Sequence, residues 1–233
     1  MAGPAASIGG DTFDHSLARD VLHLSITDAV GHGVDSALTA TLCVSGLRNA
    51  RRRGATLLEQ AQAANQAIVE NRPAGSLFAT GLLGRLHLAT GLLDLVNAGH
   101  PAPLWIRGEE VLSVPLDVNR PFGVLADKSY RADQLRLVPG DRLVLITDGM
   151  LERGAAALDL PTRLRDLARL HPREVVRVLG DLVLEVAGPA LPDDACLLVL
   201  DWYGGHGHTR CATAGADPRR ASTPDRGLER SDR

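Results

Sequence analysis

The chain has 233 residues, of which 45% are hydrophobic and 23% charged, and its formal net charge at pH 7 is −3. This length and composition are typical of one globular domain that buries roughly 70% of its unfolded surface. The slightly acidic balance argues against nucleic acid as a partner. No apolar run approaches the ~20 residues that cross a bilayer, and no signal peptide is recognisable. We therefore expect a cytoplasmic protein that has no membrane partner.

The first third of the chain predicts a hairpin followed by two helices. Apolar and polar residues alternate from Leu22 to Thr27, as in a half-buried strand, and the turn of the hairpin is expected near residues 18–20. A helix is predicted over residues 34–52, and Gly54 follows its three terminal arginines. Its buried stripe is expected to consist of Ala37, Leu38, Thr41, Leu42 and Ser45. A second helix over residues 57–70 should bury Leu57, Ala61, Ala64 and Ile68.

The rest of the chain predicts a run of short strands, two more helices and a last strand. The strands are expected at 77–88, 91–97, 102–107, 110–115, 134–137 and 142–147, the helices at 161–170 and 172–186, and the last strand at 195–203. This order is typical of an α+β fold in which two sheets pack together with helix pairs outside them. Residues 1–203 should form this domain. Residues 204–233 are rich in Gly, Arg, Asp, Pro and Ser, which predicts a disordered tail.

Acidic residues stand at four predicted strand boundaries. Asp28 and Asp148 end strands, Asp11 precedes the hairpin, and Asp193–Asp194 precede the last strand. A carboxylate at a strand end is held in place yet remains accessible, and carboxylate oxygens are the ligands that Mg²⁺ and Mn²⁺ prefer. Two such ions about 3.5–4 Å apart can activate water for phosphoryl transfer. Asp28 could instead cap the next helix, and Asp148–Gly149 could form a type I′ turn.

Other phosphate chemistries lack their motifs. A cysteine phosphatase needs Arg six residues after the nucleophile, but Asn49 follows Cys43 at that spacing. The one lysine, Lys128, is not part of a Walker loop, and no Gly-x-Ser-x-Gly elbow is present. The sequence therefore favours a metal-dependent reaction.

Seven blocks of the chain resemble the metal-dependent protein phosphatase 2C (PPM) family, and within it the bacterial SpoIIE/RsbU-like branch. They are GGDTFD (9–14), TDAVGHGVDSA (27–37), LFATGLLGRL (77–86), LLDLVNAGHPAPLW (92–105), RPFGV (120–124), LVPGDRLVLITDGMLE (137–152) and PDDACLLVL (192–200). The blocks follow the order of the family and span about 190 residues.

The resemblance implies a four-layer α-β-β-α sandwich that lacks the N-terminal helix and first strand of the family, which would expose a sheet edge. Thr12 also stands where the family has an aromatic residue. The implied activity is hydrolysis of phosphoserine or phosphothreonine by water activated between two Mn²⁺ or Mg²⁺ ions. The implied catalytic residues are Asp28 and Asp148. The implied ligands are Asp11, Asp28, the Ala29 carbonyl, Asp148 and Asp193, with Asp28 bridging the ions.

The resemblance also implies a partner, a phosphorylated anti-anti-sigma protein with a STAS domain. Gly31, His32, His100 and Asp194 are expected around the ligands. His32 lies four residues after Asp28, whereas the histidine of eukaryotic relatives lies two residues after, so we expect His32 at the rim rather than in the chemistry. His100 is expected to hold a loop by hydrogen bonds.

Two other functions stay open at this stage. The chain could be a catalytically impaired relative that binds a STAS or anti-sigma partner, or a phosphomonoesterase for small molecules. The full set of acidic residues favours the protein phosphatase.

Overall fold

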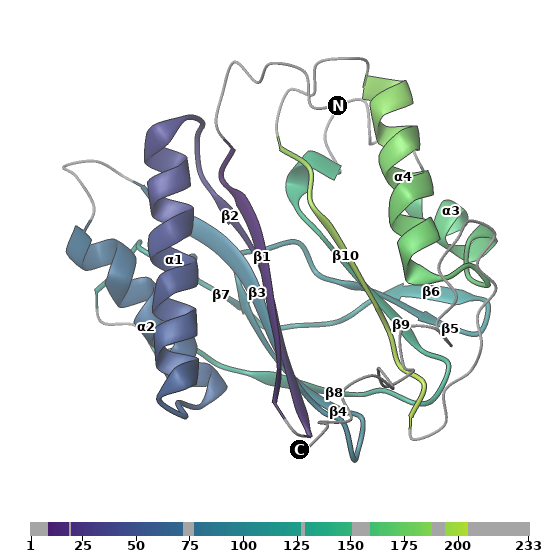
Figure 1. The fold of residues 1–233 in the computed structure, drawn as a ribbon, viewed down its shortest axis with the longest axis horizontal. Helices are drawn as coiled ribbons and strands as arrows, with labels where there is room; N and C mark the ends of the chain where they lie inside the picture. The colour runs from purple at the N-terminus through teal and green to yellow at the C-terminus, as the bar shows by residue number, and fades with distance from the viewer. Residues whose placement is uncertain are drawn as a thin grey trace, which may run out of the picture.

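The computed structural model describes residues 9–18, 20–71, 77–126, 129–150, 159–187 and 194–204. These residues form four layers: a helix pair, a six-stranded sheet, a four-stranded sheet and a second helix pair (Figure 1). The predicted α-β-β-α sandwich is therefore confirmed. Residues 205–233 of the predicted tail lie outside the described ranges. No helix within those ranges is long and apolar enough to cross a membrane.

The larger sheet has the order β1-β2-β3-β4-β7, and β8 also pairs with β4. Its strands are β1 (Asp11–Ala18), β2 (Val21–Ala29), β3 (Ala79–His87), β4 (Leu92–Ala98), β7 (Val118–Asn119) and β8 (Asp133–Arg136). The first four form antiparallel neighbours; short turns join β1 to β2 and β3 to β4, whereas α1 and α2 lie between β2 and β3 in the chain. Only the two-residue β7 was not expected from the sequence.

The smaller sheet has the order β10-β9-β5-β6. Its strands are β5 (Leu104–Arg107), β6 (Glu110–Ser113), β9 (Arg142–Ile146) and β10 (Leu197–Asp201). A short 3₁₀ helix, η1 (Asp148–Met150), follows β9. Because successive side chains of a strand point to opposite faces, Leu143 packs between the sheets and Val144 packs toward the helices.

Two helix pairs cover the outer faces of the sheets (Figure 1). The helices α1 (Val34–Arg52) and α2 (Leu57–Asn71) cover the larger sheet, and α3 (Leu160–Asp166) and α4 (Pro172–Ala187) cover the smaller one. The predicted face of α2 is buried as expected.

The predicted buried face of α1 is wrong. The residues that α1 buries are Ser36, Thr39, Ala40, Cys43, Leu47 and Ala50, whereas Leu38 is 44% exposed. Small polar residues can be buried here because their hydroxyls bond to carbonyls of the same helix, Ser36 to Gly33 and Thr39 to Asp35.

The edge strands β1 and β10 are incompletely covered. Phe13 pairs with Ile26, which lies in the core between the sheets, yet Phe13 itself is 55% exposed. All residues of β10 are half-buried although four of the five are apolar. Among the described residues, β1 and β10 are the end strands of their sheets.

Candidate metal centre

Two predicted ligands lie directly opposite each other on β1 and β2. Asp11 is the first residue of β1 and is the Cα partner of Asp28, the last residue but one of β2. Cross-strand partners have Cβ atoms about 4.5–5.5 Å apart on the same face of the sheet. Paired carboxylates at this spacing repel each other unless a cation or donors lie between them. The register thus brings two hard oxygen ligands within reach of one ion.

Thr147 connects this pair to the second sheet. Its hydroxyl donates to Asp11 Oδ2 at 2.7 Å and accepts the Cys196 N–H at 2.8 Å. Thr147 is fully buried, and its own N–H donates to the Cys196 carbonyl at 3.1 Å. Burial, with the charge of Asp11 acting in the same direction, raises the pKa of the Cys196 thiol to about 11. Asp11 is therefore held against the smaller sheet by a buried hydroxyl.

Asp148 follows Thr147 directly and is exposed at the start of η1. The alternative that Asp148 and Gly149 form a hairpin turn is wrong, because the residues begin a 3₁₀ helix after β9. Asp28 does not cap α1 either, since Gly33 holds the N-cap position.

The backbone before the last strand approaches the start of β1 closely. Asp194 accepts a hydrogen bond from the Gly10 N–H at 2.8 Å. A Cβ atom added to Gly9 would lie 2.0 Å from Asp194 Oδ2, and one added to Gly149 would lie 1.9 Å from the Asp194 carbonyl oxygen. At position 149 only glycine fits, because the obstacle there is backbone, whereas at position 9 the Asp194 side chain would have to move. Asp193, the predicted ligand, lies outside the described residues.

The end of β2 places the Ala29 carbonyl at this rim. Ala29 is buried, its N–H donates to the Gly10 carbonyl at 3.3 Å, and a Cβ at Gly10 would lie 2.5 Å from Ala29 O. Gly31 and Gly33 have φ values of 89° and 87°, which other residues rarely adopt. Glycine is required at these two positions because the backbone adopts a positive φ there.

The donors gathered at this rim are oxygens, which fit a hard divalent cation. Four separate parts of the chain meet here, represented by Asp11, Asp28, Thr147 and Asp194. Among the residues that the structure describes, however, no three His, Cys, Asp or Glu side chains are close enough to form a ligand set by themselves. The structure thus pairs Asp11 with Asp28, and metal binding by these two residues or by others is a proposal.

The two predicted histidines differ in their surroundings. His32 is exposed in the loop before α1. His100 is 4% exposed, and its Nδ1 lies 2.8 Å from the hydroxyl of Thr80, the Cα partner of Asp28. Both backbone polar groups of His100 bond to the Asn97 side chain, so hydrogen bonds hold the loop here, and the expected place of His100 around the ligands stays a prediction. Burial lowers the pKa of His100 to about 4, against an opposing backbone hydrogen bond to Ile146.

The sequence analysis did not identify Thr147 or Thr80 as site residues. Thr147 lies 136 residues from its partner Asp11, so no local pattern predicts the contact. The available signal was a hydroxyl residue placed directly before a strand-end Asp, as at Thr27–Asp28 and Thr147–Asp148.

Comparison with known proteins relates this chain to bacterial phosphatases. Phosphoserine phosphatase RsbP of Bacillus subtilis (strain 168) is 23% identical over 206 residues, covering 84% of this chain and 50% of RsbP. Phosphoserine phosphatase RsbU of the same organism is 23% identical over 204 residues, covering 84% of this chain and 60% of RsbU. The chain thus spans about half to three fifths of these curated relatives.

Solved structures share the fold. The RsbU and RsbW domains of Rv1364c from Mycobacterium tuberculosis superpose with a TM-score of 0.76 at 26% identity, covering 88% of this chain and 58% of that one. The SiaA-PP2C domain of Pseudomonas aeruginosa gives a TM-score of 0.72 at 23% identity, covering 83% of this chain and 80% of that one. The family model of stage II sporulation protein E (SpoIIE) matches residues 18–203. The chain therefore belongs to the SpoIIE family of PPM-type phosphatases.

Proposed function

We propose that this chain is a metal-dependent protein phosphatase that hydrolyses phosphoserine or phosphothreonine. The observation that carries the proposal is the register of β1 and β2, which sets Asp11 opposite Asp28 at the rim of the sandwich. RsbX, a structural relative solved in complex with magnesium, supports the choice of a hard cation.

The proposed ligands are Asp11, Asp28, the Ala29 carbonyl, Asp148 and Asp193, holding two Mn²⁺ or Mg²⁺ ions. Such ions, when bound, supply an activated water and neutralise charge on the phosphoryl oxygens. Asp28, which lies between Asp11 on β1 and Thr80 on β3, is the residue that would contact both ions. Thr147 holds the Asp11 carboxylate in one orientation, as partners of metal ligands commonly do.

The proposed substrate is a phosphorylated anti-anti-sigma protein with a STAS domain. Support comes from RsbP and RsbU, which are named phosphoserine phosphatases, and from a structural relative described as part of the bacterial stressosome. A panel of phosphorylated STAS proteins, phosphopeptides and small phosphomonoesters tests this choice. Faster turnover of the small esters than of any phosphoprotein would contradict it.

A binding module without turnover is the second candidate. It is favoured by the lack of three clustered ligand side chains among the residues that the structure describes. Hydrolysis of p-nitrophenyl phosphate by the purified protein, with Mn²⁺ and with excess EDTA, separates the two functions. No Mn²⁺-dependent turnover by folded protein would leave only the binding module.

Two substitutions test the assigned residues. Asp28→Asn and Asp148→Asn should each abolish Mn²⁺-dependent turnover and leave thermal unfolding of the metal-free protein near that of the unmodified chain. Asp181→Asn is a matched control, because Asp181 is an exposed carboxylate on α4 whose printed contact within the described ranges is an ion pair with Arg177. Activity of Asp28→Asn close to that of the control would show that the bridging role is wrong.

A further inference from the structure

Thr80 continues the row of polar side chains that begins with Asp11 and Asp28. It is the Cα partner of Asp28 on β3, as Asp11 is on β1. The side chains of such partners lie on the same face of a sheet. Leu82, two residues along β3 from Thr80, belongs to the core between the sheets, so this is the face turned toward the smaller sheet. Thr80 is half-buried and lies beside Asp28 at the rim of that face.

The buried ring of His100 is the hydrogen-bond partner of the Thr80 hydroxyl. Its Nδ1 lies 2.8 Å from Thr80 Oγ1. The backbone N–H and carbonyl of His100 both bond to the side chain of Asn97, which is itself buried. A parallel β-bridge between Gly81 and Gly99 joins the two segments directly beside this contact. The position of the ring against Thr80 is therefore fixed by its backbone.

The second ring nitrogen of His100 indicates where the proton of the ring lies. Nε2 is buried and has no partner of full hydrogen-bond geometry among the described residues, but a backbone hydrogen bond to Ile146 favours the protonated ring. Of the two backbone groups only a carbonyl has this effect, and Nδ1 is occupied by Thr80, so Nε2 carries the N–H that faces the Ile146 carbonyl. Burial lowers the pKa of His100 to about 4, so the ring is neutral at pH 7. Nδ1 is then an acceptor, and the Thr80 hydroxyl donates to it.

This donation leaves only lone pairs on the rest of the Thr80 oxygen. A hydroxyl has one proton and two acceptor positions, so Thr80 Oγ1 does not also donate to the carboxylate of Asp28. Cross-strand partners have Cβ atoms about 4.5–5.5 Å apart. One water molecule can bridge two acceptors at this spacing by donating to both. The rim therefore presents a neutral acceptor oxygen beside the carboxylates.

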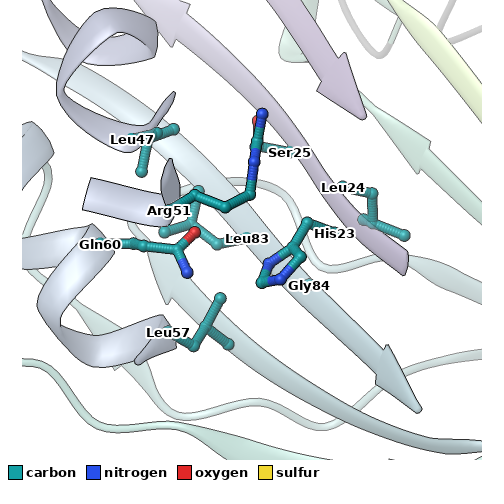
Figure 2. Close-up of a pocket in the computed structure, with 9 residues that line it drawn as sticks. All are labelled: His23, Leu24, Ser25, Leu47, Arg51, Leu57, Gln60, Leu83 and Gly84. Atoms are coloured by element: carbon teal, nitrogen blue, oxygen red, sulfur yellow. The ribbon is translucent and has the colours of Figure 1, made fainter. Parts of the chain in front are cut away.

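Another buried histidine nitrogen of the larger sheet has a different explanation. Nδ1 of His23 on β2 lacks a partner within the part of the chain that the structure describes. The ring lines a hollow beneath the turn between α1 and α2, together with Arg51 and Gln60 (Figure 2). This hollow has polar walls and room for about one water molecule, which can pair with His23. Of the two histidines, His100 is the one that bonds to a residue beside a candidate ligand.

We propose that Thr80 is a positioning residue of the candidate metal centre, whose hydroxyl, fixed by His100, accepts a hydrogen bond from a water molecule that Asp28 also binds. The inference rests on the proposed function, since this water would belong to the hydration of the ion that Asp28 holds. Mg²⁺ usually keeps several water molecules when it binds to a protein, and acceptors around the ion orient them. Thr80 then orients water from β3, while Thr147 orients Asp11 from the smaller sheet.

The first measurement is the tautomer of His100 in metal-free protein at pH 7. Proton–nitrogen correlation spectra separate protonated from unprotonated ring nitrogens, and the signals lost in His100→Gln identify this ring among the 8 histidines of the chain. We expect an unprotonated Nδ1 and a protonated Nε2. A protonated Nδ1 would overturn the proposal, because the Thr80 hydroxyl could then donate to Asp28.

The second measurement is the affinity of the metal-free protein for Mg²⁺ and for Mn²⁺, by calorimetry. Thr80→Val keeps the shape of the side chain but removes the hydroxyl, and it should weaken binding by about tenfold or more, as loss of a hydrogen-bonding partner around a metal site typically does. Thr80→Ser keeps the hydroxyl and should retain most of the affinity. Adding His100→Leu to Thr80→Val should cause no further loss, because the ring acts through the hydroxyl.

Thr90→Val is the matched control. Thr90 is exposed in the turn between β3 and β4, where its hydroxyl accepts from the Leu92 N–H, at the other end of β3 from Thr80. This variant should bind both ions as the unmodified chain does. Thermal unfolding in EDTA measures the structural cost of each substitution separately, and a merely structural role would lower the stability of Thr80→Val without lowering its metal affinity below that of Thr80→Ser. Equal Mn²⁺ affinity in Thr80→Val and Thr90→Val would show that the role of Thr80 is wrong while the metal centre stands, and no Mn²⁺ binding by the unmodified chain would refute both.

Discussion

Replacement of Thr147 by valine tests whether the link between the two sheets positions Asp11. Valine keeps the shape of threonine but replaces the hydroxyl by a methyl group. The side chain is fully buried and makes two hydrogen bonds, to Asp11 Oδ2 at 2.7 Å and from Cys196 N at 2.8 Å. The substitution removes both hydrogen bonds, and because the site is fully buried, water cannot easily replace them.

The magnitude follows from these two contacts. A buried group left without its partner costs about 1–3 kcal/mol. The half-exposed Asp11 carboxylate can bind water instead, so losing this hydrogen bond costs little. We therefore expect the free energy of unfolding to fall by about 2–3 kcal/mol in total. For a domain of this size that corresponds to a melting temperature lower by about 4–12 °C. Loss of a hydrogen-bond partner of a metal ligand also typically weakens metal binding by about 10–100-fold.

Urea and thermal unfolding in EDTA measure the first effect, and Mn²⁺ titration by calorimetry and by activity measures the second. Thr147→Ser keeps the hydroxyl and should retain most of the Mn²⁺ affinity although it loses a methyl group from the core. A purely structural role would lower stability in both variants without separating their Mn²⁺ affinities. Unchanged Mn²⁺ affinity in Thr147→Val would refute the positioning role.

Three further perturbations follow from the described contacts. Gly149→Ala places a Cβ atom 1.9 Å from the Asp194 carbonyl oxygen and should destabilise the protein by about 1–3 kcal/mol in urea unfolding, whereas Gly180→Ala in α4 meets open space and should be neutral or stabilising by up to about 1 kcal/mol. Arg142→Met leaves the buried Asp201 carboxylate without its 2.7 Å ion pair and should lower the free energy of unfolding by about 3–5 kcal/mol. If the double variant Arg142→Met/Asp201→Leu regains this stability, the loss comes from the unpaired charge. If the double variant is as unstable as Arg142→Met, this explanation is wrong. Since the folded-state pKa of His100 is about 4 and that of an unfolded histidine about 6.5, its contribution to stability is complete above pH 6.5 and is lost as the pH falls toward 4. His100→Gln should make the urea midpoint less sensitive to pH across this range, and an unchanged pH profile would contradict that assignment.

Most of the secondary structure was predictable because it follows local pattern. The alternation in β2 and the spacing of Leu57, Ala61, Ala64 and Ile68 in α2 each identify a buried face directly. The face of α1 was not predictable in this way, because Ser36 and Thr39 look polar in the sequence but satisfy their hydroxyls within the helix.

The short strand β7 could not be predicted from the sequence for a different reason, because long-range contacts hold it in place. It has two residues and pairs with β4 in parallel. Asn119 secures it, donating to the carbonyls of Asn97 and Arg131 and accepting from the Arg131 N–H. These bonds join positions 12 and 22 residues apart, so no periodic pattern in the sequence predicts the strand.

In the candidate metal centre, part of the arrangement follows from local sequence pattern and part depends on long-range packing. The sequence shows that Asp28 and Asp148 end strands, but whether strand ends meet depends on register and on how the two sheets pack. The register places Asp11 opposite Asp28 within one sheet. Contact with the other sheet depends on the Thr147 hydroxyl and on the Gly10 N–H, which bonds to Asp194. Since the carboxylates come from two sheets that are joined through a close-packed core, their separation is set by that core as much as by the loops that carry them. A change in inter-sheet packing should therefore alter metal affinity even where it leaves every ligand in place.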